Sequence, residues 1–181
     1  DTMIFDGNSF RPEAGLLQRI QQFRGSSIQF VLSEIVAKEV IAHLTKAASE
    51  AQAQFDSACK SIEKSWLIPR TALDSTFSTL FQKKSAKRFA QERFYAFVER
   101  MGCKEISASE HVDVTELLRR YFVPEAPFSQ KDTKKNEFPD AFALLSLEAM
   151  AQKSGKKLLV VSKDGDWVQF CNDSDTLIHV E

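Results

Sequence analysis

Two aspartates separated by one predicted helix and one predicted strand are the residues best placed to do chemistry in this sequence. Asp140 stands in the first turn of a helix predicted over residues 137–155. Asp164 directly follows an almost wholly apolar run at residues 156–162, which is typical of a buried strand. A helix that leads into a buried parallel strand brings its acids to one edge of an α/β sheet, where such folds build their sites. Because carboxylates gathered there repel one another unless a cation lies between them, the pattern predicts a metal site.

Two further acids map to the same edge. Asp1 opens the segment DTMIF, which is apolar and partly β-branched and is predicted to be the end of a strand. Glu39 lies in a helix that follows the predicted strand at residues 27–33 and that Ser33 can cap. Glu34 competes with Glu39 for the same role, since both come shortly after this strand. Glu39 is favoured because it is the polar interruption in the apolar stretch VAKEVIAHL.

Four carboxylates at one edge suit a hard divalent cation. Mg²⁺ and Mn²⁺ take oxygen ligands, and Mg²⁺ usually keeps several waters while one or two carboxylates bind it. Four acids can hold one or two such ions with coordination positions left open. An ion held in this way orients a phosphodiester, generates a hydroxide nucleophile and neutralises charge on the leaving oxygen. The acids therefore predict hydrolysis of a phosphodiester bond.

The two C-terminal acids also have a purely structural interpretation. Pro139 suits the first position of a helix, and the helix dipole favours an anion in the first turn by about 0.3–1 kcal/mol, so Asp140 could serve only to start its helix. The Asp-Gly pair after the strand is a turn signal by itself. Ser162 could donate a hydrogen bond to a carboxylate or a metal-bound water, and Asp166 could be a ligand, a helix cap or a solvent-facing residue. His43 is left out of the site because the HExxH pattern is absent.

The elements that must position these acids alternate between strands and helices. A helix is predicted where apolar residues recur at helical spacing, over residues 12–23, and strands are predicted at residues 27–33, 156–162 and 176–180. Strands this apolar, separated by helices, favour a central, mostly parallel sheet covered on both sides, which is a three-layer α/β/α fold. Residues 47–123 are interpreted as a helical insertion or cap within a single domain over residues 1–181.

The composition is that of a globular protein without disulfides. The 181 residues are 43% hydrophobic and 27% charged, which suits one compact domain. Three cysteines without any CxxC pair indicate neither a disulfide framework nor a zinc cluster, and they favour a reducing compartment. The sequence contains no run of about 18 apolar residues and no signal-peptide pattern. We therefore expect a cytoplasmic protein that does not enter a membrane.

Binding of a nucleic acid would depend on local basic patches, since the net charge of −1 gives no overall basic field. The segment at residues 81–100 combines basic residues with aromatic residues that are expected to pack inward. It could contact phosphates or be a solvated amphipathic helix. A second basic group directly precedes the helix of Asp140. The candidate phosphate contacts are Lys83, Lys84, Lys87, Arg88, Lys134 and Lys135.

Taken together, the motifs resemble those of PIN domains. The stretches DTMIF, VAKEVIAHL, EFPDAFALL and SKDGDW are similar, over essentially the whole chain, to motifs of a PIN-like branch with EFPDA-type and SxDxD-type sequences. The resemblance implies a metal-dependent nuclease with an α/β/α fold, Mg²⁺ or Mn²⁺ as the cofactor, and RNA as the commonest substrate. It also implies service as a bacterial toxin or defence effector, for which an antitoxin or a fused regulatory domain would be the partner.

The resemblance also assigns roles to individual residues. It implies that the catalytic and metal-binding acids are Asp1, Glu39, Asp140 and Asp164. Asp166 would be a further metal ligand, with Ser162 and Glu137 in support. One position departs from the family pattern. PIN domains often have a small polar residue two positions after the first acid, whereas this chain has Met3, so a hydrogen bond near the metal would be lost.

Two other interpretations remain open. A Toprim-like phosphotransfer enzyme also uses a Glu and a DxD sequence after a strand, but it would leave Asp140 without a role. A degenerate PIN fold would bind RNA or a protein without cleaving it, and the presence of all four acids argues against this. Both RNA and DNA stay open as substrates.

Overall fold

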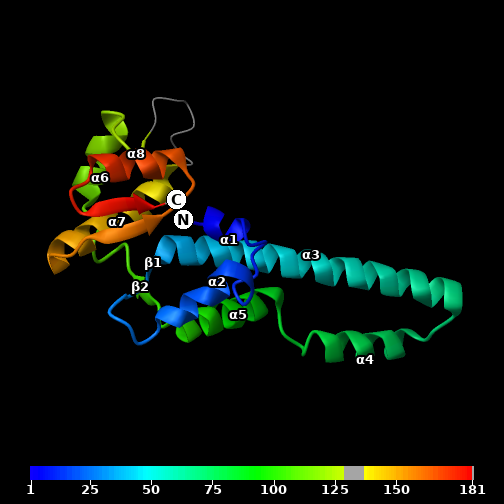
Figure 1. Ribbon diagram of the computed structural model, residues 1–181. Coiled ribbons are helices and arrows are strands. Elements are labelled where there is room, and N and C mark those ends of the chain that lie inside the picture. Colours follow the sequence, from blue (N-terminus) through cyan, green and yellow to red (C-terminus); the bar gives the residue numbers. More distant parts are fainter. Residues whose placement is uncertain (129–136, 181) are drawn as a thin grey trace. The chain divides into compact units, whose positions relative to one another are not determined.

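The computed structural model describes residues 1–128 and 137–180 of the chain, which form two compact units. The first unit comprises Asp1–Val40 and Val98–Glu181, and the second comprises Ile41–Phe97. Figure 1 labels the elements of both. Two helices, α3 (Glu34–Trp66) and α5 (Ala86–Met101), contribute residues to each unit. All four predicted metal-binding acids belong to the first unit.

The chain begins with a helix, α1 (Met3–Asp6), where the end of a strand was predicted. The main-chain N–H of Met3 donates to the carboxylate of Asp1 at 3.0 Å, which starts a turn. The carbonyl of Thr2 then accepts the N–H groups of Phe5 and Asp6 at 3.0 and 3.1 Å. These backbone groups are satisfied locally rather than by a neighbouring strand. The strand prediction for DTMIF is therefore wrong.

The helix predicted over residues 12–23 is confirmed from Gly15 onward. It consists of α2 (Gly15–Arg19) and a 3₁₀ turn, η1 (Ile20–Phe23). Residues 24–30 then lead into the first strand. The predicted helix cap is also confirmed, because the hydroxyl of Ser33 accepts the N–H of Ile35 at 3.3 Å at the start of α3.

The strands form two parallel pairs. Strand β1 (Val31–Ser33) pairs with β2 (Lys104–Ile106), and β3 (Leu158–Val161) pairs with β4 (Leu177–Val180). The strands predicted at residues 27–33, 156–162 and 176–180 and their parallel pairing are confirmed, although each strand is shorter than predicted. Within the described residues the pairs are two separate two-stranded sheets rather than one continuous sheet. Strand β2 lies inside the stretch that was predicted to be helical.

Strand β3 is buried on only one face, whereas the sequence predicted burial on both. Val160 is 5% exposed and faces the core with Leu177 of β4. Leu159, its neighbour in the strand, is 70% exposed, and Val161 is also exposed. An apolar run predicts that at least one face of a strand is buried, but it does not distinguish a strand buried on one face from a strand buried on both.

The core of the first unit is built on helix α7 (Phe138–Ser154), which contacts β1, β4, α6 (Val114–Phe122) and α8 (Gly165–Asp173). Its buried residues include Ala141, Leu144 and Leu147. Helix α7 ends at Gly155, whose φ of 64° is the left-handed conformation that glycine adopts readily. Helix α8 follows β3 and lies beside β4, as Figure 1 shows.

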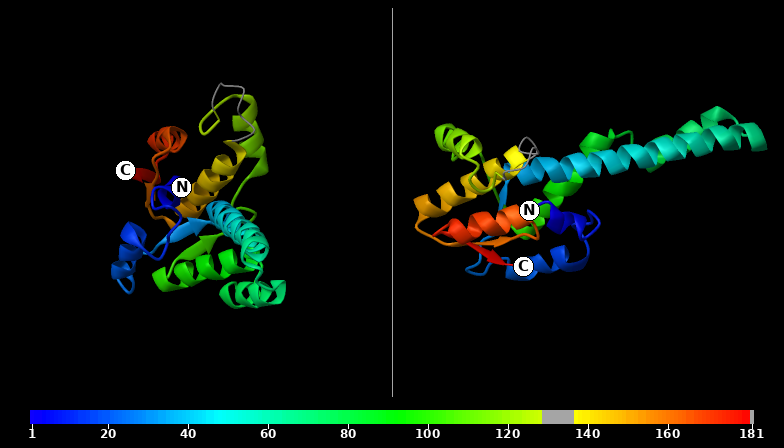
Figure 2. Two further views of the ribbon diagram at one scale, coloured as in Figure 1. Left: turned by 90° about the vertical axis from the view of Figure 1, so that its right-hand side faces the viewer. Right: turned by 90° about the horizontal axis from the view of Figure 1, so that it is seen from above.

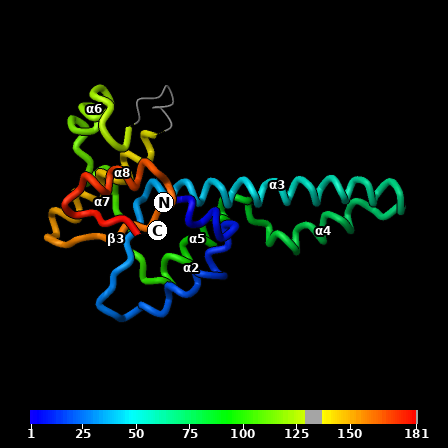
Figure 3. The backbone as a smooth tube through the Cα atoms, turned by 45° about the horizontal axis from the view of Figure 1, so that its top comes forward, coloured from blue at the N-terminus to red at the C-terminus, as the bar shows by residue number. Residues whose placement is uncertain are grey.

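The second unit is helical. Helix α4 (Arg70–Leu80) turns back along α3, as Figures 2 and 3 show. Phe55 of α3 contacts Phe77 and Phe81 with ring centroids 5.8 and 5.7 Å apart. Arg70 forms an ion pair with Asp56 at 2.8 Å. No helix in residues 1–128 or 137–180 is long and apolar enough to cross a membrane.

Candidate metal centre

Each of the four predicted acids stands at the start of a helix or close to it. Asp1 precedes α1, and Glu39 lies in the second turn of α3. Asp140 is in the first turn of α7, as predicted, with Pro139 among the first residues of that helix. Asp164 is the N-cap residue of α8, where its carboxylate accepts the N–H of Asp166 at 2.8 Å.

Ser162 joins the first and last of these acids. Its side chain is fully buried directly after β3, and its hydroxyl donates to Oδ2 of Asp1 at 2.7 Å. Oγ of Ser162 also accepts the main-chain N–H of Asp164 at 3.0 Å. The carbonyl of Ser162 in turn accepts a hydrogen bond from Nε2 of His179 on β4 at 2.8 Å. Two acids 163 positions apart in the numbering are thus tied to one hydroxyl.

Thr2 connects Glu39 to the segment that contains Asp1. Its hydroxyl donates to Oε2 of Glu39, and the adjacent N–H of Met3 donates to Asp1. Met3 therefore takes part through its main chain, and the position next to it, Thr2, supplies the hydroxyl. Glu34, the competing acid, is directed elsewhere, because Oε1 accepts the N–H of Ala108 at 3.1 Å and Oε2 lies 3.4 Å from the ammonium of Lys38.

Asp140 is the acid whose ionisation the surroundings affect most clearly. Burial raises its pKa, while the hydrogen bond from Nε1 of Trp167, at 2.7 Å, acts in the opposite direction. The negative charges of Glu39 and Asp164 raise the pKa further. Asp140, Glu39 and Asp164 therefore form one electrostatically coupled group, and the hydrogen bonds of Ser162 connect Asp1 to Asp164.

Within the described ranges, these four acids have no ion pair with any Lys or Arg side chain. Their hydrogen-bond partners are hydroxyls, an indole and main-chain N–H groups. Carboxylate oxygens held in this way are the donors that Mg²⁺ and Mn²⁺ prefer, so the donor set fits such an ion. As the side chains stand, however, no three His, Cys, Asp or Glu groups in this part of the chain are close enough together to hold a metal ion.

The three supporting residues occupy different positions. Ser162 has the bridging contacts given above. Asp166 is half-buried and donates its N–H to the carboxylate of Asp164. The N-cap residue of α8 is therefore Asp164 and not Asp166. Glu137 is 9% exposed and directly precedes α7.

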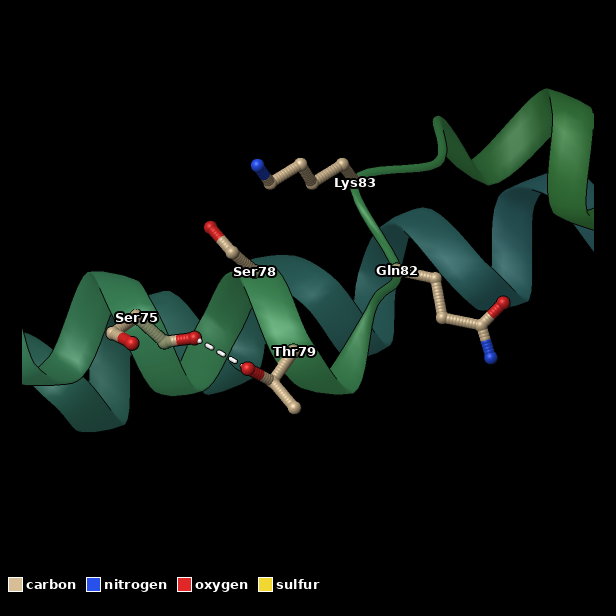
Figure 4. A pocket seen from close by; sticks show the side chains of 5 residues that line it. All are labelled: Ser75, Ser78, Thr79, Gln82 and Lys83. Atoms are coloured by element: carbon tan, nitrogen blue, oxygen red, sulfur yellow. Dashed lines mark hydrogen bonds between the residues drawn. The ribbon is translucent and has the colours of Figure 1, made fainter.

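The predicted basic contacts on α5 and just before it lie in the second unit. Lys84 and Arg88 both pair with Glu92, at 2.7 and 2.9 Å. Lys87 is exposed on α5, and Lys83 lines a shallow pocket with residues of α4, drawn in Figure 4. Lys134 and Lys135 lie outside the described residues.

The aromatic residues of this segment are only partly buried. Phe94 and Phe97 are buried, as predicted, whereas Phe89 and Tyr95 are 49% and 47% exposed. The expectation that all the aromatics pack inward is therefore wrong, because the basic and aromatic positions do not separate onto two faces of α5.

Sequence reasoning missed three residues of the centre: Thr2, Trp167 and His179. A buried indole usually finds a hydrogen-bond acceptor, so the tryptophan after the SKDGD stretch was a usable signal. The hydroxyl next to Asp1 was a weaker one. Nothing in the sequence pointed to His179, since its contact with Ser162 depends on the pairing of β3 with β4.

Acidic residues at the edge of an α/β unit are the type of residue that binds divalent ions in enzymes acting on phosphate esters. The model of the PIN domain family matches residues 1–167, and the chain belongs to this family. PIN domains are generally metal-dependent nucleases. The matched residues include all four acids and Trp167. Neither the curated proteins nor the solved structures contain a match to the chain.

Proposed function

We propose that this PIN domain is a Mg²⁺- or Mn²⁺-dependent endonuclease with RNA as its substrate. The observation that supports this most strongly is the group of four acids, in which Asp140 is coupled to Glu39 and Asp164 and Ser162 connects Asp1 to Asp164. In the described part of the chain their partners are neutral donors instead of Lys or Arg. A group of acids with this arrangement gains most from an external cation.

In this proposal the four acids hold one or two ions, with Asp166 as a further ligand. A bound ion would activate a water molecule and neutralise charge on the scissile phosphate. Ser162 orients the carboxylate of Asp1 and fixes the main chain at Asp164, and Thr2 orients Glu39. Glu137, the residue that precedes α7, would support Asp140 in the first turn of that helix.

The basic residues would bind the phosphate backbone. Lys83 and Lys87 are exposed, so their ammonium groups are accessible to a polyanion. Lys84 and Arg88 would exchange Glu92 for phosphate, and Lys134 and Lys135 precede the helix of Asp140 in the sequence. RNA is favoured over DNA by the family alone. The same holds for service as a toxin or defence effector, with an antitoxin or a fused regulatory domain as partner. A cytoplasmic location is proposed from the cysteine pattern and the absence of a signal-peptide pattern in these 181 residues.

We further propose that both strand pairs belong to one central sheet of a three-layer α/β/α domain. The helical residues in the middle of the chain would then be an insertion in this domain. The parallel pairing within both pairs supports this arrangement, since parallel strands occur mainly in sheets covered by helices on both faces.

The decisive experiment is a cleavage assay with Asp140→Asn. The purified protein is incubated with RNA and with single-stranded DNA, with and without Mn²⁺. We expect RNA cleavage that requires Mn²⁺ and is abolished by Asp140→Asn, with the circular dichroism spectrum unchanged. Cleavage of RNA by this variant at the parental rate contradicts the proposal.

Glu39→Gln and Glu34→Gln provide a matched pair from one helix. Glu39→Gln is expected to abolish cleavage. Glu34→Gln should leave it intact, because Glu34 contacts Ala108 and Lys38 rather than the other acids. Equal loss in both variants would show that the choice of Glu39 is wrong.

A further inference from the structure

Trp167 is a buried side chain whose polar atom is directed at one of the four acids. It lies in the first turn of α8 and is 2% exposed. Its Nε1–H donates to Oδ1 of Asp140 at 2.7 Å. A hydrogen bond to an ionised carboxylate is stronger than one between neutral groups. The indole therefore constrains Asp140 as well as filling space in the core.

The first turn of α8 thereby holds two acids from different parts of the chain. Asp164 caps the helix through the N–H of Asp166, and Trp167 reaches Asp140 on α7. Within the described residues, Oδ2 of Asp140 has no hydrogen bond, so only one of its two oxygens is fixed by the protein. The second oxygen stays available as a ligand.

We propose that Trp167 is a positioning residue that orients the carboxylate of Asp140 for the metal ion. This inference rests on the proposed function of the site. A carboxylate rotates easily about its last side-chain bond, so a single donor on a rigid, buried ring determines where its second oxygen points. Removing an outer hydrogen bond of this kind typically weakens metal binding by about 10- to 100-fold.

The first test is Trp167→Phe, which keeps an aromatic ring in the core but removes the N–H. The dissociation constant for Mn²⁺ is measured from the electron paramagnetic resonance signal of free Mn²⁺, well below the temperature of unfolding. We expect the constant to rise by about tenfold or more. A purely structural role would lower the melting temperature without changing this constant.

Phe170→Leu is the matched control. Phe170 is buried to the same degree in the same helix, but it carries no hydrogen-bond donor. This variant is expected to lower the melting temperature while leaving the dissociation constant for Mn²⁺ at its parental value. An equal weakening of Mn²⁺ binding in both variants would assign the effect to packing and overturn the proposal.

A second measurement uses the indole itself as a probe. The chain has two tryptophans, and Trp66 is 77% exposed, so Trp66→Phe leaves Trp167 as the only tryptophan, whose fluorescence can be excited selectively over that of tyrosine. Paramagnetic Mn²⁺ bound at Asp140 should quench this fluorescence with the same midpoint as the resonance titration. Adding Asp140→Asn should remove the quenching. This measurement also decides the matter if Trp167→Phe does not fold, because absence of quenching in the Trp66→Phe protein overturns the proposal.

The outcomes separate this inference from the proposed function. Binding of Mn²⁺ that depends on Asp140 but is unaffected by Trp167→Phe overturns only the role of Trp167. If the parent protein does not bind Mn²⁺, or if Asp140→Asn binds it as tightly as the parent, both the inference and the proposed metal site fail.

Discussion

The acids of the candidate centre and the ion-paired acids of the second unit are held in different ways. In the second unit, Asp56 is paired with Lys60 and Arg70, and Glu92 is paired with Lys84 and Arg88. These pairs lie at the surface and join neighbouring helix turns, the adjacent helices α3 and α4, or α5 and the segment that precedes it. Surface pairs of this kind contribute little to stability, but they leave no carboxylate in need of a cation.

The acids of the candidate centre are held by another type of contact. Thr2, Ser162 and Trp167 each donate a hydrogen bond to one of them, over sequence separations of 37, 161 and 27 positions. Neutral donors orient a carboxylate without cancelling its charge. The difference suggests that ion-paired acids support helices, whereas acids held by neutral donors keep their charge for a ligand.

Replacing one acid of each type gives the largest expected contrast. Asp164→Asn should abolish cleavage and lower Mn²⁺ affinity by more than about a hundredfold, which exceeds the usual effect of losing an outer hydrogen bond. Asparagine caps helices about as well as aspartate, so the fold should be retained. Asp56→Asn should leave cleavage and affinity unchanged. The measurements are RNA cleavage and Mn²⁺ titration of both variants.

The contrast fails if Asp56→Asn loses as much activity as Asp164→Asn. That result would mean that ion pairs of the second unit, and not the charge of the candidate centre, determine activity. Parental activity in both variants would instead remove Asp164 from the site.

Metal binding should also stabilise the folded chain. At a Mn²⁺ concentration about 100 times the dissociation constant, a ligand that binds only the folded state adds roughly 2.7 kcal/mol to the free energy of unfolding. This corresponds to a rise of several degrees in melting temperature, measured by differential scanning fluorimetry. Asp56→Asn should show the same rise, and Asp140→Asn should show none. An unchanged melting temperature of the parent at millimolar Mn²⁺ counts against a functional centre.

The sequence was sufficient to place Glu39, Asp140 and Asp164 on their elements, but not Asp1. Asp140 in a first turn after proline and Asp164 between a strand and a helix follow from local signals, namely helix-start preferences and the length of an apolar run. The parallel pairing of the strands followed from their alternation with helices. All of these features depend on residues that are close together in the chain.

The features that the sequence did not predict depend on distant residues or on competition between local structures. The contacts of Thr2, Trp167 and His179 join segments that only the folded chain brings together. The first five residues have strand-like composition, but the carboxylate of Asp1 accepts the N–H of Met3 and starts a helix instead. The exposure of one face of β3 depends on which other elements pack against that face, and the composition of the strand does not determine this.

Two buried serines allow a smaller test of long-range against local hydrogen bonding. Ser162→Ala removes the hydroxyl that joins Asp1 and Asp164, and Mn²⁺ affinity should fall by about tenfold. Ser146→Ala removes a hydroxyl that is equally buried but bonds only the carbonyl of Ala143 in its own helix. This control should leave the affinity unchanged. Isothermal titration with Mn²⁺ distinguishes the two, and equal affinities would show that Ser162 does not position the acids.

The pH dependence of stability without metal gives the smallest expected effect, with opposite signs for the two types of acid. The pKa of Asp140 is raised above the ordinary value of 3.8, mainly by burial, so the folded chain holds this proton to higher pH than the unfolded chain. The free energy of unfolding therefore falls as the pH rises through this window. The pKa of Asp56 is lowered by its hydrogen bonds with Lys60 and Arg70. The contribution of Asp56 to the free energy of unfolding is present above the ordinary pKa of aspartate and is lost as the pH falls.

Urea unfolding between about pH 3 and pH 7 in the presence of a chelator measures both contributions. Asp140→Asn should reduce the loss of stability on raising the pH above the ordinary pKa of aspartate. Asp56→Asn should reduce the loss on lowering the pH below it. If Asp140→Asn leaves the pH dependence of the free energy of unfolding unchanged, burial does not raise the pKa of Asp140, and the proposed difference from the ion-paired acids is wrong. Because a proton on Asp140 competes with a metal ion, Mn²⁺ affinity should also weaken as the pH is lowered through the raised pKa.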